Sequence, residues 1–269
     1  LSMLKKLQLN KQQHILLQSH AKKNNIEFLS TPFEEKSLKL LLKLNISAIK
    51  VPSGEINNLE FISKIAKAKK PIILSTGMAN LGEIESAIEC LEKYNNKSIT
   101  LLHCVSQYPA KAMDTNLLAM KTISRTFNYP VGMSDHSEGL EIPIAATALG
   151  ARCIEKHFTL DKSFYGPDHK ASISPIELKD LVKSVKKTFS ALGSGIKKRS
   201  VVEENTAKVA RKSIVAHKFI EKGSKIKRKM LTLKRPGTGI EPKYLDLIIG
   251  RTTSVDIKKN ELITFKMMK

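Results

Sequence analysis

The sequence predicts an α/β fold, a parallel (β/α)₈ barrel that lacks its first two strands, followed by a small β-rich domain. Three observations support this fold. Short β-branched runs recur about 21 to 31 residues apart, helical spacing separates them, and nearly every run ends in polar residues. The predicted strands cover residues 27–32, 48–53, 70–76, 98–104, 129–135 and 151–158.

Helices are predicted between these strands. Leu59, Ile62 and Ala66 share one helical face, and Ile84, Ile88 and Leu91 share another. The regular alternation therefore indicates successive βα units.

Six βα units fit either an open doubly wound sheet or part of a barrel. An open sheet places its site at one switch point, usually beside a Gly-rich phosphate loop, and no G-x-G-x-x-G follows a strand here. A barrel instead gathers chemistry from the carboxyl ends of many strands, as this pattern does. The barrel is therefore favoured, with six of its eight strands visible.

The pattern stops near Leu192, where glycines and a basic run suggest a linker. We predict a partial barrel over residues 1–193, a linker over 194–208 and a small domain over 209–269. Its predicted strands are 213–219, 225–233 and 256–264.

Composition excludes several classes of protein. No apolar stretch approaches the roughly 18–20 residues that span a bilayer, and the first residues do not resemble a signal peptide. The three cysteines, Cys90, Cys104 and Cys153, lie far apart, which favours reduced thiols in a cytoplasmic protein.

The net charge of +21 raises the possibility of nucleic-acid binding. Residues 195–269 carry 20 Lys and Arg against 7 Asp and Glu, however, and few aromatic residues are interleaved with them. A Lys-rich solvated surface that suits an anionic substrate is the preferred interpretation, with no nucleic-acid partner.

Two histidines follow neighbouring strands. His136 follows Ser134–Asp135, and His157 follows Glu155–Lys156. Neighbouring strand ends could bring both imidazoles to one divalent metal. The alternative is one core histidine and one loop histidine, and spacing alone does not exclude it.

The sequence alone does not decide the roles of several other polar residues. His103, inside an apolar strand, is expected to be a satisfied interior histidine. Asp168 could be catalytic, bind a sugar hydroxyl or form a turn. Glu55 is expected to be functional at the barrel mouth.

Lys50 lies inside an apolar strand, where an unpaired ammonium is costly. Thr31, Ser53, Ser75 and Ser134 would join it in a ring of donors around the mouth, which suits phosphate or carboxylate. Each hydroxyl taken alone could equally cap a helix.

Eight motifs, in order, resemble the N-acetylneuraminate (sialic acid) synthase family, including its legionaminate and pseudaminate relatives. The motifs are EFLSTPF (27–33), KVPSGEI (50–56), PIILSTGM (71–78), HCVSQYP (103–109), GMSDH (132–136), IEKHFTL (154–160), GPDHKAS (166–172) and KRPGTGI (234–240). The C-terminal domain resembles the family's antifreeze-like (SAF) domain, a β-clip fold.

The resemblance implies condensation of phosphoenolpyruvate with an N-acetylmannosamine-type sugar, with release of phosphate. It implies a divalent metal, Mn²⁺ or alternatively Mg²⁺ or Co²⁺, on His136 and His157. It places phosphoenolpyruvate near Lys50 and the four hydroxyls, and makes Glu55 a mechanistic carboxylate. It also implies sugar-side residues, namely Phe33, Ser106, Tyr108, Asp168 and Arg235. In the family this arginine comes from the second subunit of a domain-swapped dimer.

Two departures and two alternatives accompany the resemblance. The family begins with two further strands, so this chain by itself is expected to be inactive or poorly folded. Some family members have Asn where this chain has Ser106, which leaves the acceptor sugar open. The alternatives are a 3-deoxy-ulosonate phosphate synthase, disfavoured by the C-terminal domain, and a carbohydrate- or ice-binding protein, which would leave both histidines and Lys50 without a role.

Overall fold

The computed structural model describes residues 7–269. The chain forms two compact units, and the boundary between them along the sequence falls between Ser194 and Gly195. Each unit has a hydrophobic core of its own. The two units are therefore described separately.

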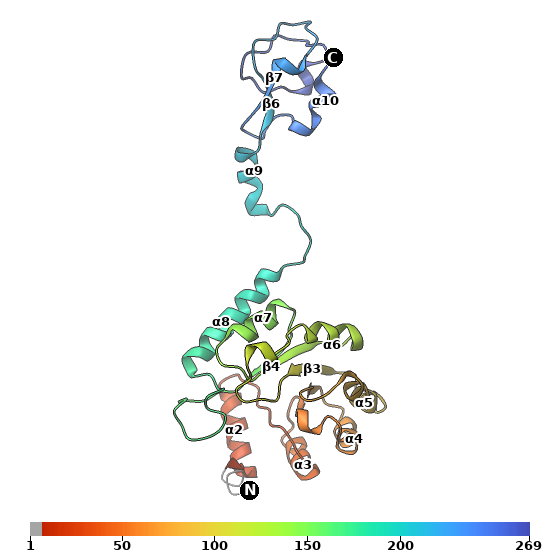
Figure 1. The fold of residues 1–269 in the computed structure, drawn as a ribbon, viewed down its shortest axis with the longest axis vertical. Helices are drawn as coiled ribbons and strands as arrows, with labels where there is room; N and C mark the ends of the chain where they lie inside the picture. Colours follow the sequence, from red (N-terminus) through yellow and green to blue (C-terminus); the bar gives the residue numbers. More distant parts are fainter. Residues whose placement is uncertain (1–6) are drawn as a thin grey trace. The chain divides into compact units, whose positions relative to one another are not determined.

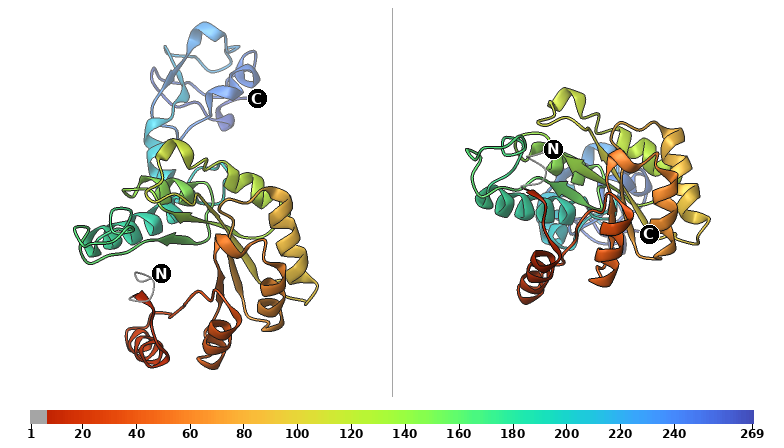
Figure 2. Two further views of the ribbon diagram at one scale, coloured as in Figure 1. Left: turned by 60° about the horizontal axis from the view of Figure 1, so that its bottom comes forward. Right: turned by 90° about the horizontal axis from the view of Figure 1, so that it is seen from below.

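The first unit is built on a curved sheet of five parallel strands in the order β1-β2-β3-β4-β5 (Figures 1 and 2). The strands are β1 (Ile49–Val51), β2 (Ile72–Ser75), β3 (Ile99–Cys104), β4 (Val131–Asp135) and β5 (Ile154–Lys156). Helices precede and follow these strands: α2 (Lys11–Lys23), α3 (Glu35–Lys43), α4 (Leu59–Lys67), α5 (Leu81–Glu92), α6 (Ala119–Phe127), α7 (Glu141–Ala148) and α8 (Pro175–Leu192). Two short 3₁₀ turns, η1 (Ser53–Glu55) and η2 (Ala112–Asp114), follow β1 and β3.

The two faces of the sheet have different chemistry because side chains alternate along a strand. One face packs against the helices, where Ile49, Leu74 and Met133 are almost fully buried in the main core. The strand register places the residues of the opposite face together. That inner face carries Lys50, Ser75, Thr100, Cys104, Ser134 and Glu155.

Local sequence explains where several helices begin. Reciprocal capping boxes start four of them, with the residues Asn10, Glu34, Asn80 and Ser174 at the N-cap. The predicted face of α5 is buried as expected, with Leu91 fully enclosed. In α4, Ile62 and Ala66 are buried as predicted, but Leu59 at the start of the helix is 42% exposed, and Phe61 and Ile65 complete the buried face.

The predicted strand at residues 27–32 is wrong. This segment has no regular secondary structure and joins no ladder in the described chain, and β1 pairs only with β2. Its apolar pattern was sufficient for a strand, but a strand also needs a hydrogen-bonding neighbour. Over residues 7–269, five parallel strands rather than six are present, and β1 and β5 form the two edges of the sheet.

The second unit is small and mostly irregular. β6 (Ser213–Ala216) pairs antiparallel with β7 (Leu231–Lys234), and isolated bridges connect residues near 220, 225 and 262 to other segments. Only parts of the predicted strands 213–219 and 225–233 are regular, and 256–264 contributes bridges alone. The remaining elements are α9 (Glu204–Ala210), α10 (Leu245–Ile248), η3 (Val201–Glu203), η4 (Arg228–Met230), η5 (Pro242–Tyr244) and η6 (Phe265–Met267).

The core of this unit consists of isoleucines such as Ile214, Ile248 and Ile257, which are completely buried. Residues 201–210 are helical although the sequence suggested a linker there. Among the helices of residues 7–269, none combines the length and the apolar character needed to cross a membrane.

Candidate active site at the carboxyl ends of the strands

His136 and His157 lie side by side at the carboxyl ends of β4 and β5. Their ring centroids are 5.3 Å apart and their planes are inclined by 75°. The ring of Tyr108 packs against both, at 4.1 Å from His136 and 5.3 Å from His157. The parallel pairing of β4 with β5 produces this neighbourhood, because equivalent strand ends meet at one edge.

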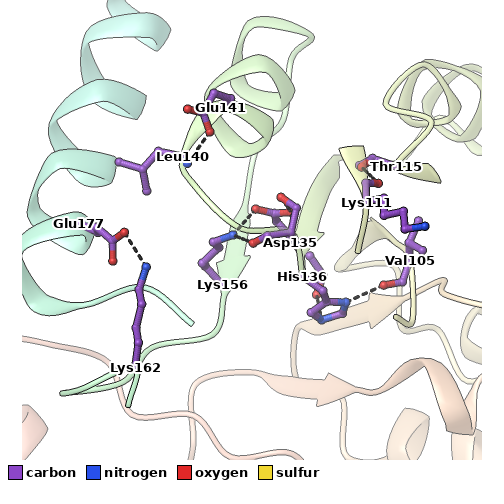
Figure 3. A network of polar contacts seen from close by, with 12 residues as sticks. Val105, Lys111, Thr115, Asp135, His136, Leu140, Glu141, Lys156, Lys162 and Glu177 are labelled. Carbon is purple, nitrogen blue, oxygen red and sulfur yellow. Dashed lines mark hydrogen bonds and ion pairs between the residues drawn. The ribbon is translucent and has the colours of Figure 1, made fainter. Parts of the chain in front are cut away.

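One ring nitrogen of His136 is hydrogen-bonded to the protein backbone. Nδ1 lies 2.7 Å from the Val105 carbonyl oxygen, which can only accept, so Nδ1 carries the proton (Figure 3). Nε2 is thereby left with its lone pair, and its nearest polar neighbour is Ser134 Oγ at 3.5 Å. A histidine fixed in this tautomer is prepared to bind a metal through Nε2.

His157 is held more loosely. Its side chain is 31% exposed, and Asp168 Oδ2 lies 3.9 Å from Nδ1. Burial lowers the pKa of His157, the nearby Asp168 carboxylate opposes that effect, and His136 lowers the pKa further. The neutral imidazole, which is the form that binds metals, is therefore favoured.

The two imidazoles fit a divalent ion with several coordination positions open. Within residues 7–269, no three His, Cys, Asp or Glu side chains are grouped closely enough to hold a metal. Two nitrogen ligands alone would leave the remaining positions to substrate or water, as in a catalytic site.

A charged pair crosses the inner face beside the histidines. Lys50 Nζ lies 3.4 Å from Glu155 Oε1, and Ser134 Oγ donates to the same oxygen at 2.6 Å. The Lys50 side chain is only 11% exposed. Lys50 therefore has a partner within the protein, which the sequence did not reveal.

Ser53, Ser106 and Cys104 surround the backbone of Gly77. The Gly77 N–H donates to Ser53 Oγ at 3.0 Å, and Ser53 Oγ lies 3.2 Å from Cys104 Sγ. A Cβ on Gly77 would come within 2.8 Å of both Ser53 Oγ and Cys104 Sγ and still closer to Ser106 Oγ. Glycine is thus required for the three side chains to converge.

Ser75 ends β2 on the same inner face. Its hydroxyl is 2% exposed, and Oγ is buried without a hydrogen-bond partner among the described residues. An unpaired buried hydroxyl costs free energy, so this atom is a natural contact for a ligand oxygen.

Four further predicted residues, Glu55, Thr31, Phe33 and Arg235, have other neighbours. Glu55 lies in η1, two residues after Ser53, and accepts from Asn58 Nδ2 at 2.7 Å. Thr31 and Phe33 line a hollow beside α2, together with His14. Arg235 belongs to the second unit, where its Nε donates to the Ala210 carbonyl at 2.9 Å.

The structure adds Glu155, Gly77 and the buried pair Asp135–Lys156 to the residues that the sequence singled out. Glu155 and Lys156 could have been found by the argument used for Lys50, since charges within a buried strand need partners. Gly77 carried no separate signal. His103 is confirmed as a satisfied interior histidine, since Nε2 lies 2.7 Å from the Thr115 carbonyl oxygen. Cys90, Cys104 and Cys153 are free.

Comparison with known proteins gives matches along nearly the whole chain. N,N'-diacetyllegionaminic acid synthase of Campylobacter jejuni is 49% identical over 98% of this chain and 79% of its own length. The enzyme of the same name from Legionella pneumophila is 44% identical over 95% of this chain and 73% of its length. The crystal structure of N-acetylneuraminic acid (sialic acid) synthetase from Leptospira borgpetersenii superimposes with a TM-score of 0.71 at 36% identity, covering 74% of this chain and 70% of that one.

The family profiles divide the chain in two. The profile of the NeuB family matches residues 1–197, and that of the SAF domain matches residues 211–269. The first match contains both histidines, Tyr108 and the Lys50–Glu155 pair, and the second contains Arg235. With the first profile covering well over half of its residues, this chain belongs to the NeuB family and carries a SAF domain.

Proposed function

We propose that this protein condenses phosphoenolpyruvate with an N-acetylated amino sugar to form a nine-carbon, sialic-acid-like acid and phosphate. The observation that carries the proposal is the pair of imidazoles at 5.3 Å beside a rim of anion-binding groups. Its relatives are synthases of this product class, which supports a transferase-type enzyme over a non-enzymatic sugar-binding protein.

His136 and His157 would hold a divalent ion, with Mn²⁺ as the first choice and Mg²⁺ or Co²⁺ as alternatives. When bound, such an ion supplies a Lewis acid for the aldehyde of the open-chain sugar. The fixed Nδ1–H of His136 supports this assignment, because it leaves Nε2 as the free donor. Tyr108 packs over both rings and limits the access of water to them.

The anionic groups of phosphoenolpyruvate would bind at the inner face. Lys50 supplies a positive charge, and Ser75 supplies a buried hydroxyl without a partner. Ser53 and Ser134 contribute further hydroxyls, and Thr31 is proposed to join them on the basis of the family resemblance.

The proposed reaction forms one carbon–carbon bond and breaks one bond to phosphate. The C2=C3 electron pair of phosphoenolpyruvate forms the bond from C3 to the aldehyde carbon of the sugar, whose oxygen takes up a proton and becomes a hydroxyl. Water then adds at the electron-deficient C2 and loses a proton. The resulting tetrahedral centre breaks its C–O bond to phosphate, which leaves as inorganic phosphate. Glu55 is proposed as the carboxylate that moves a proton in this sequence, since it follows Ser53 on the same rim.

The sugar would lie between Tyr108, Asp168, Ser106 and Phe33, with Arg235 contributed by a second subunit. Asp168 already faces His157 at 3.9 Å, which supports a position for the sugar over the imidazoles. We therefore propose a domain-swapped homodimer. Sedimentation velocity should give a dimer at micromolar concentration, and a strictly monomeric protein would contradict this part of the proposal.

The acceptor is proposed to be a 2,4-diacetamido sugar rather than N-acetylmannosamine. The legionaminic acid synthases are 49% and 44% identical to this chain, against 36% for the sialic acid synthetase structure. We also propose that the curved sheet is part of a (β/α)₈ barrel and that the SAF domain is a β-clip. Three free cysteines favour a cytoplasmic location.

Phosphate release from phosphoenolpyruvate tests the reaction. The assay uses each sugar with and without Mn²⁺, on this chain and on a form extended by the two strands that the family resemblance implies. Turnover of the diacetamido sugar that needs Mn²⁺ is expected. Mn²⁺-independent turnover, or unchanged Mn²⁺ binding by His136→Ala, would contradict the metal assignment.

A further inference from the structure

Asp135 and Lys156 form a buried ion pair directly behind the two histidines. Lys156 Nζ lies 2.6 Å from Asp135 Oδ2, and the two side chains are 1% and 3% exposed for Asp135 and Lys156 respectively. Asp135 is the last residue of β4 and Lys156 the last of β5, and they are register partners. Each immediately precedes one of the histidines, so the pair joins the two points at which the imidazoles begin.

Figure 3 shows the contact between Lys156 and Asp135, and further hydrogen bonds make it a small network. Asp135 Oδ1 accepts from the Ser137 backbone N–H at 2.9 Å and from Ser137 Oγ at 2.7 Å. Lys156 Nζ also donates to the Ser137 carbonyl oxygen. The residue on the far side of His136 is thereby attached to β5. Asp135 and Ser137, the residues before and after His136, are thus held in place by contacts that do not involve the His136 ring.

The network lies on the opposite face from the proposed ligand site. Successive side chains of a strand point to opposite faces, and Ser134 and Glu155, the preceding residues, interact on the inner face. No hydrogen bond or ion pair between the Asp135–Lys156 pair and either imidazole occurs in residues 7–269. The pair therefore positions the histidines through the backbone, and the charge of Lys156 adds the smallest of the effects that shift the pKa of His157, lowering it.

The chemistry of the pair specifies the register of the two strands. A shift of β5 by one residue would place either Glu155 or His157 opposite Asp135. The first would bring two carboxylates together, and the second would withdraw a proposed ligand from the site. An apolar pair could hold the strands equally well, and often at lower free-energy cost, but it would supply no directional contact that fixes the distance between the two strand ends.

We propose that Asp135 and Lys156 are positioning residues whose ion pair fixes the separation of His136 and His157, and with it the affinity and geometry of the metal site. This inference rests on the proposed function of the two histidines. It assigns a role to the pair that does not require contact with substrate or metal.

The test measures Mn²⁺ alone, by electron paramagnetic resonance, and the visible absorption of bound Co²⁺. Asp135→Asn keeps the shape of the side chain and removes its charge, and Lys156→Met removes the ammonium. Each variant should bind Mn²⁺ about 10- to 100-fold more weakly while remaining folded by circular dichroism. The Co²⁺ spectrum should also change, because the ligand geometry is no longer fixed.

Tyr129→Phe is the matched control. Tyr129 precedes β4 at its other end and donates to Glu92 Oε1 at 2.5 Å, so its loss affects the same strand far from the histidines. It should lower thermal stability with no effect on Mn²⁺ affinity or on the Co²⁺ spectrum. If Mn²⁺ affinity follows thermal stability equally in all three variants, the pair has only a structural role and the inference is wrong.

A double variant covers the case in which a single buried charge prevents folding. Asp135→Asn with Lys156→Met leaves no uncompensated charge, and the inference requires weakened Mn²⁺ binding here too. His136→Ala separates the two proposals. If it abolishes Mn²⁺ binding while the double variant binds normally, only the positioning role fails. If it leaves Mn²⁺ binding intact, the proposed metal site itself fails.

Discussion

Lys50 Nζ lies 3.4 Å from Glu155 Oε1, although the two residues belong to the two edge strands of the sheet, β1 and β5. Three strands separate them along the hydrogen-bonded order. A flat sheet with strands about 4.8 Å apart would hold them far beyond contact. The ion pair is therefore direct evidence that the sheet is curved, with Lys50 and Glu155 facing each other across its inner face.

Replacing Glu155 by Gln should destabilise the fold. Lys50, 11% exposed, would lose its carboxylate partner, and Ser134 would lose its charged acceptor. Breaking a fully buried pair costs about 3–5 kcal/mol, and since Glu155 is 40% exposed we expect about 1–2 kcal/mol in the free energy of unfolding. Denaturant titration measures this change.

The control for that measurement is Glu60→Gln. Glu60 pairs with Lys64 on the surface of α4 at 2.8 Å, where its side chain is 82% exposed. Surface pairs contribute about 0–1 kcal/mol. A loss for Glu155→Gln no larger than that for Glu60→Gln would contradict a structural role for the pair.

Gly77→Ala should block the binding of phosphoenolpyruvate. The new methyl group would enter the space where Ser53, Cys104 and Ser106 converge, and overpacking of this kind costs about 1–3 kcal/mol. Calorimetric titration with phosphoenolpyruvate should show at least a tenfold loss of affinity. Gly54→Ala provides the comparison, because a methyl group there would meet no atom within 4 Å. Equal affinities of the two variants for phosphoenolpyruvate would show that the side chains around Gly77 do not belong to its binding site.

The sequence was sufficient to predict which strand ends carry the chemistry. Residues immediately after neighbouring parallel strands can converge, so the meeting of His136 and His157 was one of the two interpretations that their positions allowed, and the ring distance of 5.3 Å supports it. Helical periodicity predicted the buried face of α5, and in α4 it predicted Ile62 and Ala66 but wrongly included the exposed Leu59.

The partner of Lys50 could not be predicted, because Glu155 is distant in sequence and meets Lys50 only through the curvature of the sheet. The segment 27–32 failed for a related reason. Its residues have the composition of a strand, but a strand exists only where a neighbouring backbone completes its hydrogen bonds, and local sequence does not specify that neighbour.

Mn²⁺ binding should keep its strength down to mildly acidic pH. Burial lowers the pKa of His157, so protons compete with the metal for this ligand mainly below the ordinary histidine range. The folded state also binds fewer protons here than the unfolded chain. The contribution of His157 to stability is therefore complete above pH about 6.5 and is lost as the pH falls through its lowered pKa. Mn²⁺ affinity measured from pH 8 to pH 5 should stay constant near neutral pH and decrease at the acidic end.

Asp168→Asn should shift the loss of Mn²⁺ affinity to lower pH. The carboxylate raises the pKa of His157 against the effect of burial, so its removal lowers the pKa further. Asp180→Asn, an exposed change on α8, should leave the pH dependence of Mn²⁺ affinity as it is. A shift to higher pH in Asp168→Asn would mean that the carboxylate does not act on His157 as described.

Ser213→Ala should disturb the loop that presents Arg235. Ser213 is fully buried, its Oγ donates to the Pro236 carbonyl at 2.6 Å, and it accepts the Gly239 N–H at 2.9 Å. Loss of both bonds leaves two backbone groups unpaired, at a cost of about 1–3 kcal/mol. If Arg235 binds the sugar, the KM for the sugar should rise while the affinity for phosphoenolpyruvate stays constant.

Thr253→Val distinguishes loop positioning from general loss of stability in the same unit. Thr253 is 2% exposed, and its Oγ1 donates to the Glu221 carbonyl at 2.8 Å and accepts from the Ser224 N–H at 3.1 Å. This hydroxyl resembles Ser213 in burial and bonding, but it serves other loops. Its removal should lower stability to a similar extent without changing the KM for the sugar. A rise in that KM in both variants would show that Ser213 acts through the stability of the unit, whereas a rise in Ser213→Ala alone would support the role of the loop around Arg235.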